Sequence, residues 1–127
     1  MKRNKAGLFL MWVLSLILLF TSSAFADKAS VSIEAPPDVA KGSEIIIRLT
    51  IIHNANNFFH HVEWVKVWIN KQEFAKWDYS ATQMPEGATF TKELKYVVND
   101  GVEIRGEASC NVHGSKGPAV LNLSVKK

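Results

Sequence analysis

The sequence predicts an all-β protein, an immunoglobulin-like β-sandwich of about seven strands. Three observations indicate this fold class. Apolar and polar residues alternate with a period of two through most of the chain, as they do in strands with one buried face. Turn-forming residues such as glycine, proline, asparagine and aspartate separate these segments at short intervals. No segment after the N-terminal apolar run has the 3.6-residue apolar period of an amphipathic helix.

The first 26 residues have the composition of a secretory signal peptide. Basic residues come first, and Ala6–Phe20 is an almost unbroken apolar run, shorter than the roughly 20 residues of a membrane-spanning helix. Small residues, Ala24 and Ala26, occupy the two positions that a signal peptidase reads. We therefore expect cleavage after Ala26 and export to the periplasm or the extracellular space, with a membrane anchor as the alternative.

Cleavage would leave residues 27–127 as one domain, long enough for a single hydrophobic core. Three of the 15 basic residues precede the cleavage site, so this domain contains 12 basic and 12 acidic residues. The net charge of +3 therefore belongs to the signal peptide. A neutral domain lacks the electrostatic attraction to phosphate backbones on which nucleic-acid binding depends, and that function is not expected.

The first half of the domain contains two alternating segments. A strand is expected around Val31 and Ile33, which alternate with serines until the turn-forming segment 35–38. After a glycine turn, Glu44–Ile52 is predicted to be a strand because its isoleucines and leucine recur at every second position and share one face. The loop 53–59, rich in asparagine, ends this segment.

The next two strands are expected over Val62–Ile69 and Glu73–Tyr79. In the first, valine and isoleucine occupy one face, while tryptophan and lysine occupy the other. The turn at 70–72 separates the two strands, and a loop containing 84–87 follows the second. Phe90–Val98 then alternates again, with Lys92 as the one polar residue on its apolar face.

The last two strands complete the predicted sandwich. Asn99-Asp100-Gly101 is typical of a β-hairpin turn, which would pair the strands on either side of it. Val102–Cys110 follows, and its alternation points Cys110 inward at the end of the strand. After a loop over 114–118, Ala119–Val125 closes the domain.

The residues that carry chemistry are one cysteine and four histidines. A lone cysteine cannot form an internal disulfide, and in an oxidising compartment it needs protection by burial or by a metal. Cys110 and His113 have a two-residue spacing that lets one loop offer two ligands, and the other histidines lie in one nine-residue window. Thiolate and imidazole suit iron, zinc or copper. The alternatives are an inert buried cysteine and exposed loop histidines. Because neighbouring side chains in an extended segment point to opposite faces, at least one of His60 and His61 is not expected to be a ligand.

Three segments resemble a known family. Cys110–Gly114, Cys-Asn-Val-His-Gly, is similar to the Cys-Asn-x-His-Gly signature of superoxide reductases, the iron domain of the desulfoferrodoxin family. The segment from His53 to Val65 resembles that family's His-Pro-Asn … His-His-Ile-x-Trp-Ile, and Lys28–Glu34 resembles its Lys-His-x-Pro-x-Ile-Glu. The resemblance covers nearly all of residues 27–127 and implies an immunoglobulin-like sandwich. With one cysteine, the chain resembles the neelaredoxin-like, one-iron members.

The resemblance implies a function and a set of site residues. The family binds one ferrous iron through equatorial histidines and an axial cysteine thiolate, and it reduces superoxide to hydrogen peroxide at the open position. The matching positions are His53, His60 and His113 as equatorial ligands, Cys110 as the axial ligand, and Lys28 as the lysine that attracts the anion and helps to supply protons. Electrons would come from a separate donor protein. Family members commonly form homo-oligomers, although no pattern here marks an interface.

The chain departs from the family pattern at Ala29, which replaces the fourth equatorial histidine, and at Asn54 and Phe59. These departures favour, as an alternative, a metal-binding or sensing module without turnover. A second alternative is a cupredoxin-like copper electron carrier, although no methionine follows His113 to serve as its weak axial ligand. A third is an interaction module without a metal, whose apolar surface would come from Trp64, Trp68 and Trp77.

Overall fold

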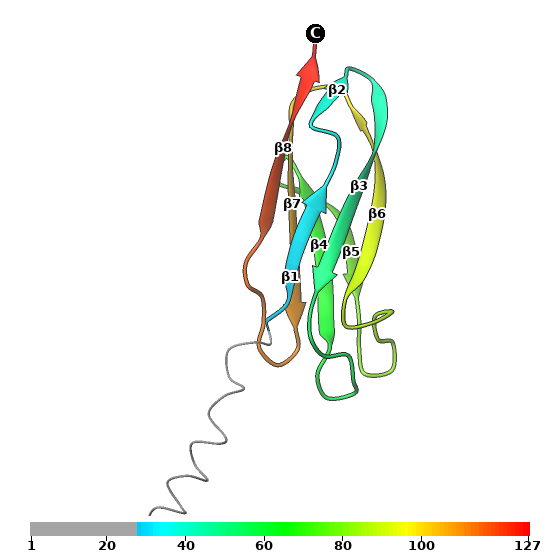
Figure 1. The fold of residues 1–127 in the computed structure, drawn as a ribbon, viewed down its shortest axis with the longest axis vertical. Helices are drawn as coiled ribbons and strands as arrows, with labels where there is room; N and C mark the ends of the chain where they lie inside the picture. Colours follow the sequence, from blue (N-terminus) through cyan, green and yellow to red (C-terminus); the bar gives the residue numbers. More distant parts are fainter. Residues whose placement is uncertain (1–27) are drawn as a thin grey trace, which may run out of the picture.

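A computed structural model describes residues 28–127, and the predicted signal peptide lies outside this range. Eight strands and no helix occur in the described range, in two sheets that pack face to face (Figure 1). No helix within residues 28–127 is long and apolar enough to cross a membrane. The all-β prediction is confirmed. The strands are β1 Ser30–Glu34, β2 Asp38–Ala40, β3 Ser43–Ile52, β4 Val62–Ile69, β5 Gln72–Asp78, β6 Phe90–Val98, β7 Val102–Cys110 and β8 Ala119–Lys126.

The smaller sheet has the order β1-β3-β6, and the larger has the order β2-β8-β7-β4-β5. All strand pairs are antiparallel except β2 and β8, which are parallel. Every strand expected from the sequence is present, with bounds that agree to within one or two residues. The eighth, β2, was not expected, because it has three residues and pairs with the C-terminal strand, which lies far away in the sequence.

One predicted connection is wrong. Asn99-Asp100-Gly101 was expected to form a hairpin, but β6 pairs with β3 in the smaller sheet, whereas β7 lies between β8 and β4 in the larger sheet. The segment therefore crosses from one sheet to the other. The residue types of a tight turn specify a local reversal of the chain, but they do not determine which strands then exchange hydrogen bonds.

The core lies between the two sheets and follows the predicted alternation. On β3, alternate residues from Ile45 to Ile51 are buried, and the residues between them are exposed or half-buried. On β4 and β7 the same pattern buries one face of each strand, and Cys110 at the end of β7 is 2% exposed. Burial of these side chains drives the two sheets together, and the inward direction predicted for Cys110 is confirmed.

Candidate metal centre

Three segments that are distant in the sequence meet at one end of the sandwich (Figure 1). Ser30 pairs with Ile52, so the start of β1 lies beside the end of β3. Val62 pairs with Cys110, so the start of β4 lies beside the end of β7. Because neighbouring antiparallel strands run in opposite directions, one edge collects the loop after β3, the loop after β7 and the start of β1.

His53, His60 and Cys110 form a compact group of donor atoms. One ligand atom from each of the three residues lies within 4.8 Å of the others. Nε2 of His60 is 2.9 Å from Sγ of Cys110, and the rings of His53 and His60 meet edge to face with centroids 4.7 Å apart. His53 and Cys110 are buried, and His60 is half-buried. The two segments predicted to meet therefore do so.

His113 lies at the open side of this group. Its Nδ1 is 3.4 Å from Nε2 of His60, and the two ring centroids are 5.0 Å apart. His113 is exposed, unlike His53 and Cys110. His113 therefore lies next to the group of three through its contact with His60, toward which it presents Nδ1, but it is not itself part of that group. The role of all four residues as ligands remains a prediction.

The turn after β7 holds the sulfur in place. The backbone N–H groups of Val112 and His113 both donate to Sγ of Cys110, each at 3.3 Å. The N–H and C=O of Cys110 bond the C=O and N–H of Gly114, each at 3.0 Å, which closes the turn. Gly114 has φ of +78°, a conformation that other residues adopt only with strain. The backbone of this turn therefore favours glycine at position 114. The two N–H dipoles directed at the sulfur suit a negatively charged thiolate.

The loop after β3 orients the histidine rings through backbone carbonyl groups. Nδ1 of His53 lies 2.7 Å from the carbonyl oxygen of Ala55, so this nitrogen donates, and Nε2 carries the lone pair. Asn57 and His60 exchange two backbone hydrogen bonds, which form a tight turn immediately before β4. Nδ1 of His61 lies 3.0 Å from the carbonyl oxygen of Asn57. The structure therefore places His60 in the group of donor atoms, whereas His61 is buried and bonded to the loop backbone.

Asn111 joins the two ligand-bearing segments, a role that the residue pattern alone did not reveal. Its Oδ1 accepts the N–H of His61 at 3.0 Å, and its Nδ2 donates to the carbonyl oxygen of Phe59 at 3.1 Å. Its backbone N–H also donates to the carbonyl oxygen of His61 at 3.1 Å. These three bonds fix His60, which lies between Phe59 and His61, relative to the neighbouring Cys110.

Replacing Asn111 with alanine should lower the free energy of unfolding by about 1–3 kcal/mol, because two backbone groups lose their side-chain partner. Chemical denaturation of the metal-free protein would measure this loss. Asn122→Ala is the matched control, because Asn122 is exposed on β8 and its side chain makes no hydrogen bond within residues 28–127. Equal effects of the two substitutions would show that Asn111 does not join the segments.

Ala29 is fully buried beside the Cys110–Gly114 turn. Its N–H donates to the carbonyl oxygen of Gly114 at 3.2 Å, the same oxygen that accepts the N–H of Cys110. Its carbonyl oxygen accepts the N–H of Lys116 at 2.9 Å. Lys28, which precedes Ala29, is exposed. The start of β1 is therefore bonded directly to the ligand-bearing turn, and this bonding places position 29 next to the candidate site.

The loop between β5 and β6 supports the loop after β3. Nδ2 of Asn56 donates to the carbonyl oxygen of Pro85, and the hydroxyl of Thr89 donates to the carbonyl oxygen of His53. An ion pair between the half-buried Lys92 and the exposed Glu86 also lies in this region.

The ammonium of Lys92 is about 6 Å from three aromatic ring centroids, those of Trp77, Tyr79 and Phe90. Burial has the largest single effect on the pKa of Lys92 and lowers it, but the hydrogen bonds and charges of Glu86 and Tyr79 together outweigh burial, so this pKa lies above its ordinary value. The same hydrogen bond lowers the pKa of the Glu86 carboxyl group. Burial raises the pKa of Tyr79.

The lowered pKa of Glu86 predicts a pH-dependent contribution to stability. Because the folded protein holds this carboxylate ionised, the contribution is full above the ordinary pKa of 4.5 and is lost as the pH falls through the lower folded value. Glu86→Gln should reduce the free energy of unfolding at pH 7 by at most about 1 kcal/mol, because the Glu86 side chain is 58% exposed and water screens the pair.

Denaturation of wild type and Glu86→Gln at a series of pH values would test this, and the difference should shrink progressively as the pH falls below 4.5. Glu44→Gln removes an exposed carboxylate that makes no ion pair within residues 28–127, so it should leave the profile unchanged. A difference between wild type and Glu86→Gln that stays constant as the pH falls below 4.5 would contradict the assignment.

The donor set suits a transition metal. Thiolate sulfur and imidazole nitrogen are ligands that iron, zinc and copper accept. Two such donors bound to one ion at about 2.3 Å and about 2.1 Å, with a right angle between them, lie roughly 3.1 Å apart. The observed 2.9 Å between Sγ of Cys110 and Nε2 of His60 is close to this separation. The residues present therefore fit a mononuclear metal site.

Comparisons with known proteins bear on the same segments. The family model described as desulfoferrodoxin matches residues 21–115. The superoxide reductase (neelaredoxin) from Ignicoccus hospitalis superposes with a TM-score of 0.67 and 16% identity, over 85% of this chain and 89% of that chain. A proposed superoxide reductase from Thermotoga maritima gives a TM-score of 0.64 and 21% identity, over 76% and 86%.

The fold is shared with proteins of other function. The sulfur carrier protein SoxY from Chlorobium limicola superposes with a TM-score of 0.52 and 12% identity, over 76% of this chain and 79% of that chain. At these identities the likeness to solved structures concerns the fold alone. No curated protein matches the chain.

Proposed function

The chain belongs to the desulfoferrodoxin family, and from this premise we propose that it holds one non-haem iron and reduces superoxide to hydrogen peroxide. The observation that carries the proposal is the group formed by His53, His60 and Cys110, whose donor atoms lie within 4.8 Å of one another. No other group of three or more such side chains within residues 28–127 is close enough to hold a metal ion.

Four residues would hold the iron: His53 and His60 before β4, and Cys110 and His113 after β7. Bound iron supplies the single electron that superoxide needs. Cys110 would contribute its sulfur, to which two backbone N–H groups donate. The carbonyl of Ala55 holds the ring of His53 in the tautomer whose Nε2 carries the lone pair.

Lys28 would attract the substrate and help to supply protons. Superoxide is an anion, and reduction of one superoxide to hydrogen peroxide consumes one electron and two protons. Lys28 is exposed and directly precedes Ala29, whose backbone is bonded to the Cys110–Gly114 turn. A lysine at this position adds positive charge near the Cys110–Gly114 turn, which increases the encounter rate with a small anion.

Electrons must come from another protein, because the sequence contains one cysteine and cannot build a second iron centre with four cysteine ligands. Residues 27–127 form the proposed active domain. Export and cleavage after Ala26 remain part of the proposal. N-terminal sequencing of the protein recovered from cells tests the cleavage, and an intact N-terminus would contradict it.

A metal-binding or sensing module without turnover is the second candidate. Ala29 favours it, because this residue stands where the family resemblance places a fourth histidine and is fully buried against the ligand-bearing turn. An alanine side chain offers no donor atom. A site with fewer protein ligands would still bind the metal but need not turn over.

Rapid mixing of the iron-loaded protein with superoxide separates the two candidates. Superoxide reduction should consume superoxide and release one hydrogen peroxide for each superoxide, without oxygen. Metal analysis and visible spectra of the oxidised protein should show iron bound to a thiolate. A stable iron spectrum that superoxide does not change would support the module without turnover, and an intense blue copper spectrum would contradict both.

A further inference from the structure

The outer face of the larger sheet contains a hollow far from the metal centre. Its volume is about 450 Å³, and it is lined by Trp68, Lys71, Arg105 and Glu107. Trp68 is six residues from the start of β4, and at about 3.3 Å per residue this places the hollow roughly 20 Å from the metal end. Nothing in the proposed function uses these four residues.

The sheet register brings three of these side chains together. Trp68 on β4 pairs with Arg105 on β7, and Lys66 pairs with Glu107 in the same two strands. Because successive side chains alternate across a strand and Val67, Ile104 and Gly106 face the core, Trp68, Arg105 and Glu107 face outward.

Lys71 reaches the hollow from a strained turn. Asn70 and Lys71, which join β4 to β5, have φ of +49° and +68°, and Lys71 occupies a turn position that favours glycine. The backbone N–H and the side-chain oxygen of Asn70 bond the C=O and the N–H of Glu103, which fixes this turn to β7. Strained backbone conformations of this kind cluster at binding and active sites, which favours a functional role for the Lys71 side chain.

The charged groups of the hollow have no partners among residues 28–127. The ion pairs there join Arg48 to Glu93, Lys76 to Asp78 and Lys92 to Glu86, and none involves the hollow. The Lys66 ammonium lies 4.9 Å from the ring of Trp64, outside the hollow. The hollow therefore presents an aromatic side chain, two cations and one carboxylate.

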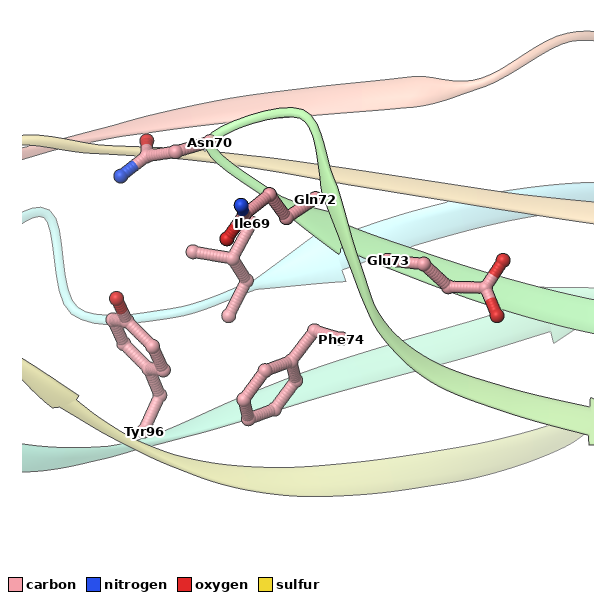
Figure 2. A pocket seen from close by; sticks show the side chains of 6 residues that line it. All are labelled: Ile69, Asn70, Gln72, Glu73, Phe74 and Tyr96. Carbon is pink, nitrogen blue, oxygen red and sulfur yellow. The ribbon is translucent and has the colours of Figure 1, made fainter.

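A neighbouring hollow at the same turn has a different character. Its volume is about 160 Å³, and it lies between β4, β5 and β6. Figure 2 shows the rings of Phe74 and Tyr96 beside the side chain of Ile69, while the carboxylate of Glu73 points away from them. The two rings meet edge to face at 5.5 Å. Without a cation in its lining, this hollow does not select an anion.

We propose that the hollow lined by Trp68, Lys71, Arg105 and Glu107 binds an acidic saccharide. The C–H face of a sugar ring stacks on an indole, a sugar carboxylate pairs with the guanidinium and the ammonium, and sugar hydroxyl groups donate to the carboxylate of Glu107. Each lining side chain then has a partner, and the net positive charge of the lining favours a uronate over a neutral sugar.

Calorimetric titration with tetragalacturonate tests the proposal, with the carboxyl-reduced form of the same tetrasaccharide as the neutral probe. We expect the acidic form to bind at least tenfold more tightly. Trp68→Ala and Arg105→Gln should each weaken binding by at least tenfold. Lys95→Gln is the matched charge control, because Lys95 is exposed on β6 in the other sheet.

The Lys71→Gly variant distinguishes a loss of binding from a loss of folding, because its expected effects on the two are opposite. It should weaken binding and, by relieving the turn, raise the midpoint of thermal unfolding by roughly 4 °C. Absence of binding, equal binding of the neutral tetrasaccharide, an equal loss in Lys95→Gln, or equally tight binding of inorganic phosphate would each overturn the proposal. None of these results would affect the proposed iron function, because the hollow shares no residue with that site.

Discussion

Replacing Cys110 with alanine is expected to abolish the visible absorption of the oxidised, iron-loaded protein and to weaken iron binding by more than about 100-fold. Loss of an outer-shell partner of a metal ligand already costs about 10–100-fold, and Cys110 is proposed as a ligand itself. Three groups also contact the sulfur of Cys110, namely Nε2 of His60 and the backbone N–H groups of Val112 and His113. Titration with ferrous iron under anaerobic conditions measures the affinity.

Ser109→Ala is the matched control for this experiment. Ser109 is the preceding residue of β7 and is also buried, but its hydroxyl lies 3.2 Å from the carboxylate of Glu63 and 3.4 Å from the backbone carbonyl oxygen of Cys110, and it makes no hydrogen bond to Sγ of Cys110. The control should keep the spectrum and the affinity of the wild type. If Cys110→Ala retained both, the sulfur would not be a ligand, and the proposed iron site would be excluded.

Replacing Gly106 with valine should destabilise the fold by about 3 kcal/mol, with a smaller loss for alanine. A Cβ atom at position 106 would lie 2.9 Å from Cδ2 of Leu49 and 3.3 Å from side-chain atoms of both Ile33 and Val31. Leu49 is fully buried, so its side chain has little room to move. The larger sheet approaches β1 and β3 closely at this point, and only glycine leaves enough space.

Gly101→Ala provides the comparison, because a Cβ atom there would meet only the carbonyl oxygen of Leu123 at 3.7 Å, an ordinary contact. Its effect should stay within about 0.5 kcal/mol. Chemical denaturation of the three variants in the absence of metal measures the series. Equal stabilities of Gly106→Val and Gly101→Ala would show that the two sheets are not packed closely at β7.

The strands and their buried faces were predictable because alternation is a local property of the chain. On β3, for example, the apolar residues from Ile45 to Ile51 had to share one face, whatever strand lay beside them. The sequence contains no comparable local pattern that indicates which distant strands pair. The three residues of β2 form a strand only because β8 lies parallel to them, and Asn99-Asp100-Gly101 has hairpin residue types although it joins different sheets.

The donor residues of the candidate site were also predictable, because a lone cysteine and clustered histidines are conspicuous by residue type alone. The residues that hold these donor side chains in place were not predictable. Asn111 bonds Phe59 and His61 across about 50 residues of sequence, and nothing in either segment indicates these bonds. The same limit applies to the outer hollow, where Lys71 meets Trp68 and Arg105 only through the turn and the sheet register.

By itself, the sequence determined that this protein is built of strands, which residues of each strand are buried, and which side chains can bind a metal, since all three depend on residue type and local spacing. The tertiary structure alone decided which strands pair and how Asn111 connects the two loops, and it bonds His61 to the loop backbone while the expected ligand His60 lies beside Cys110. The physical reason is that contacts between distant segments depend on the packing of the whole core, which no short stretch of residues specifies.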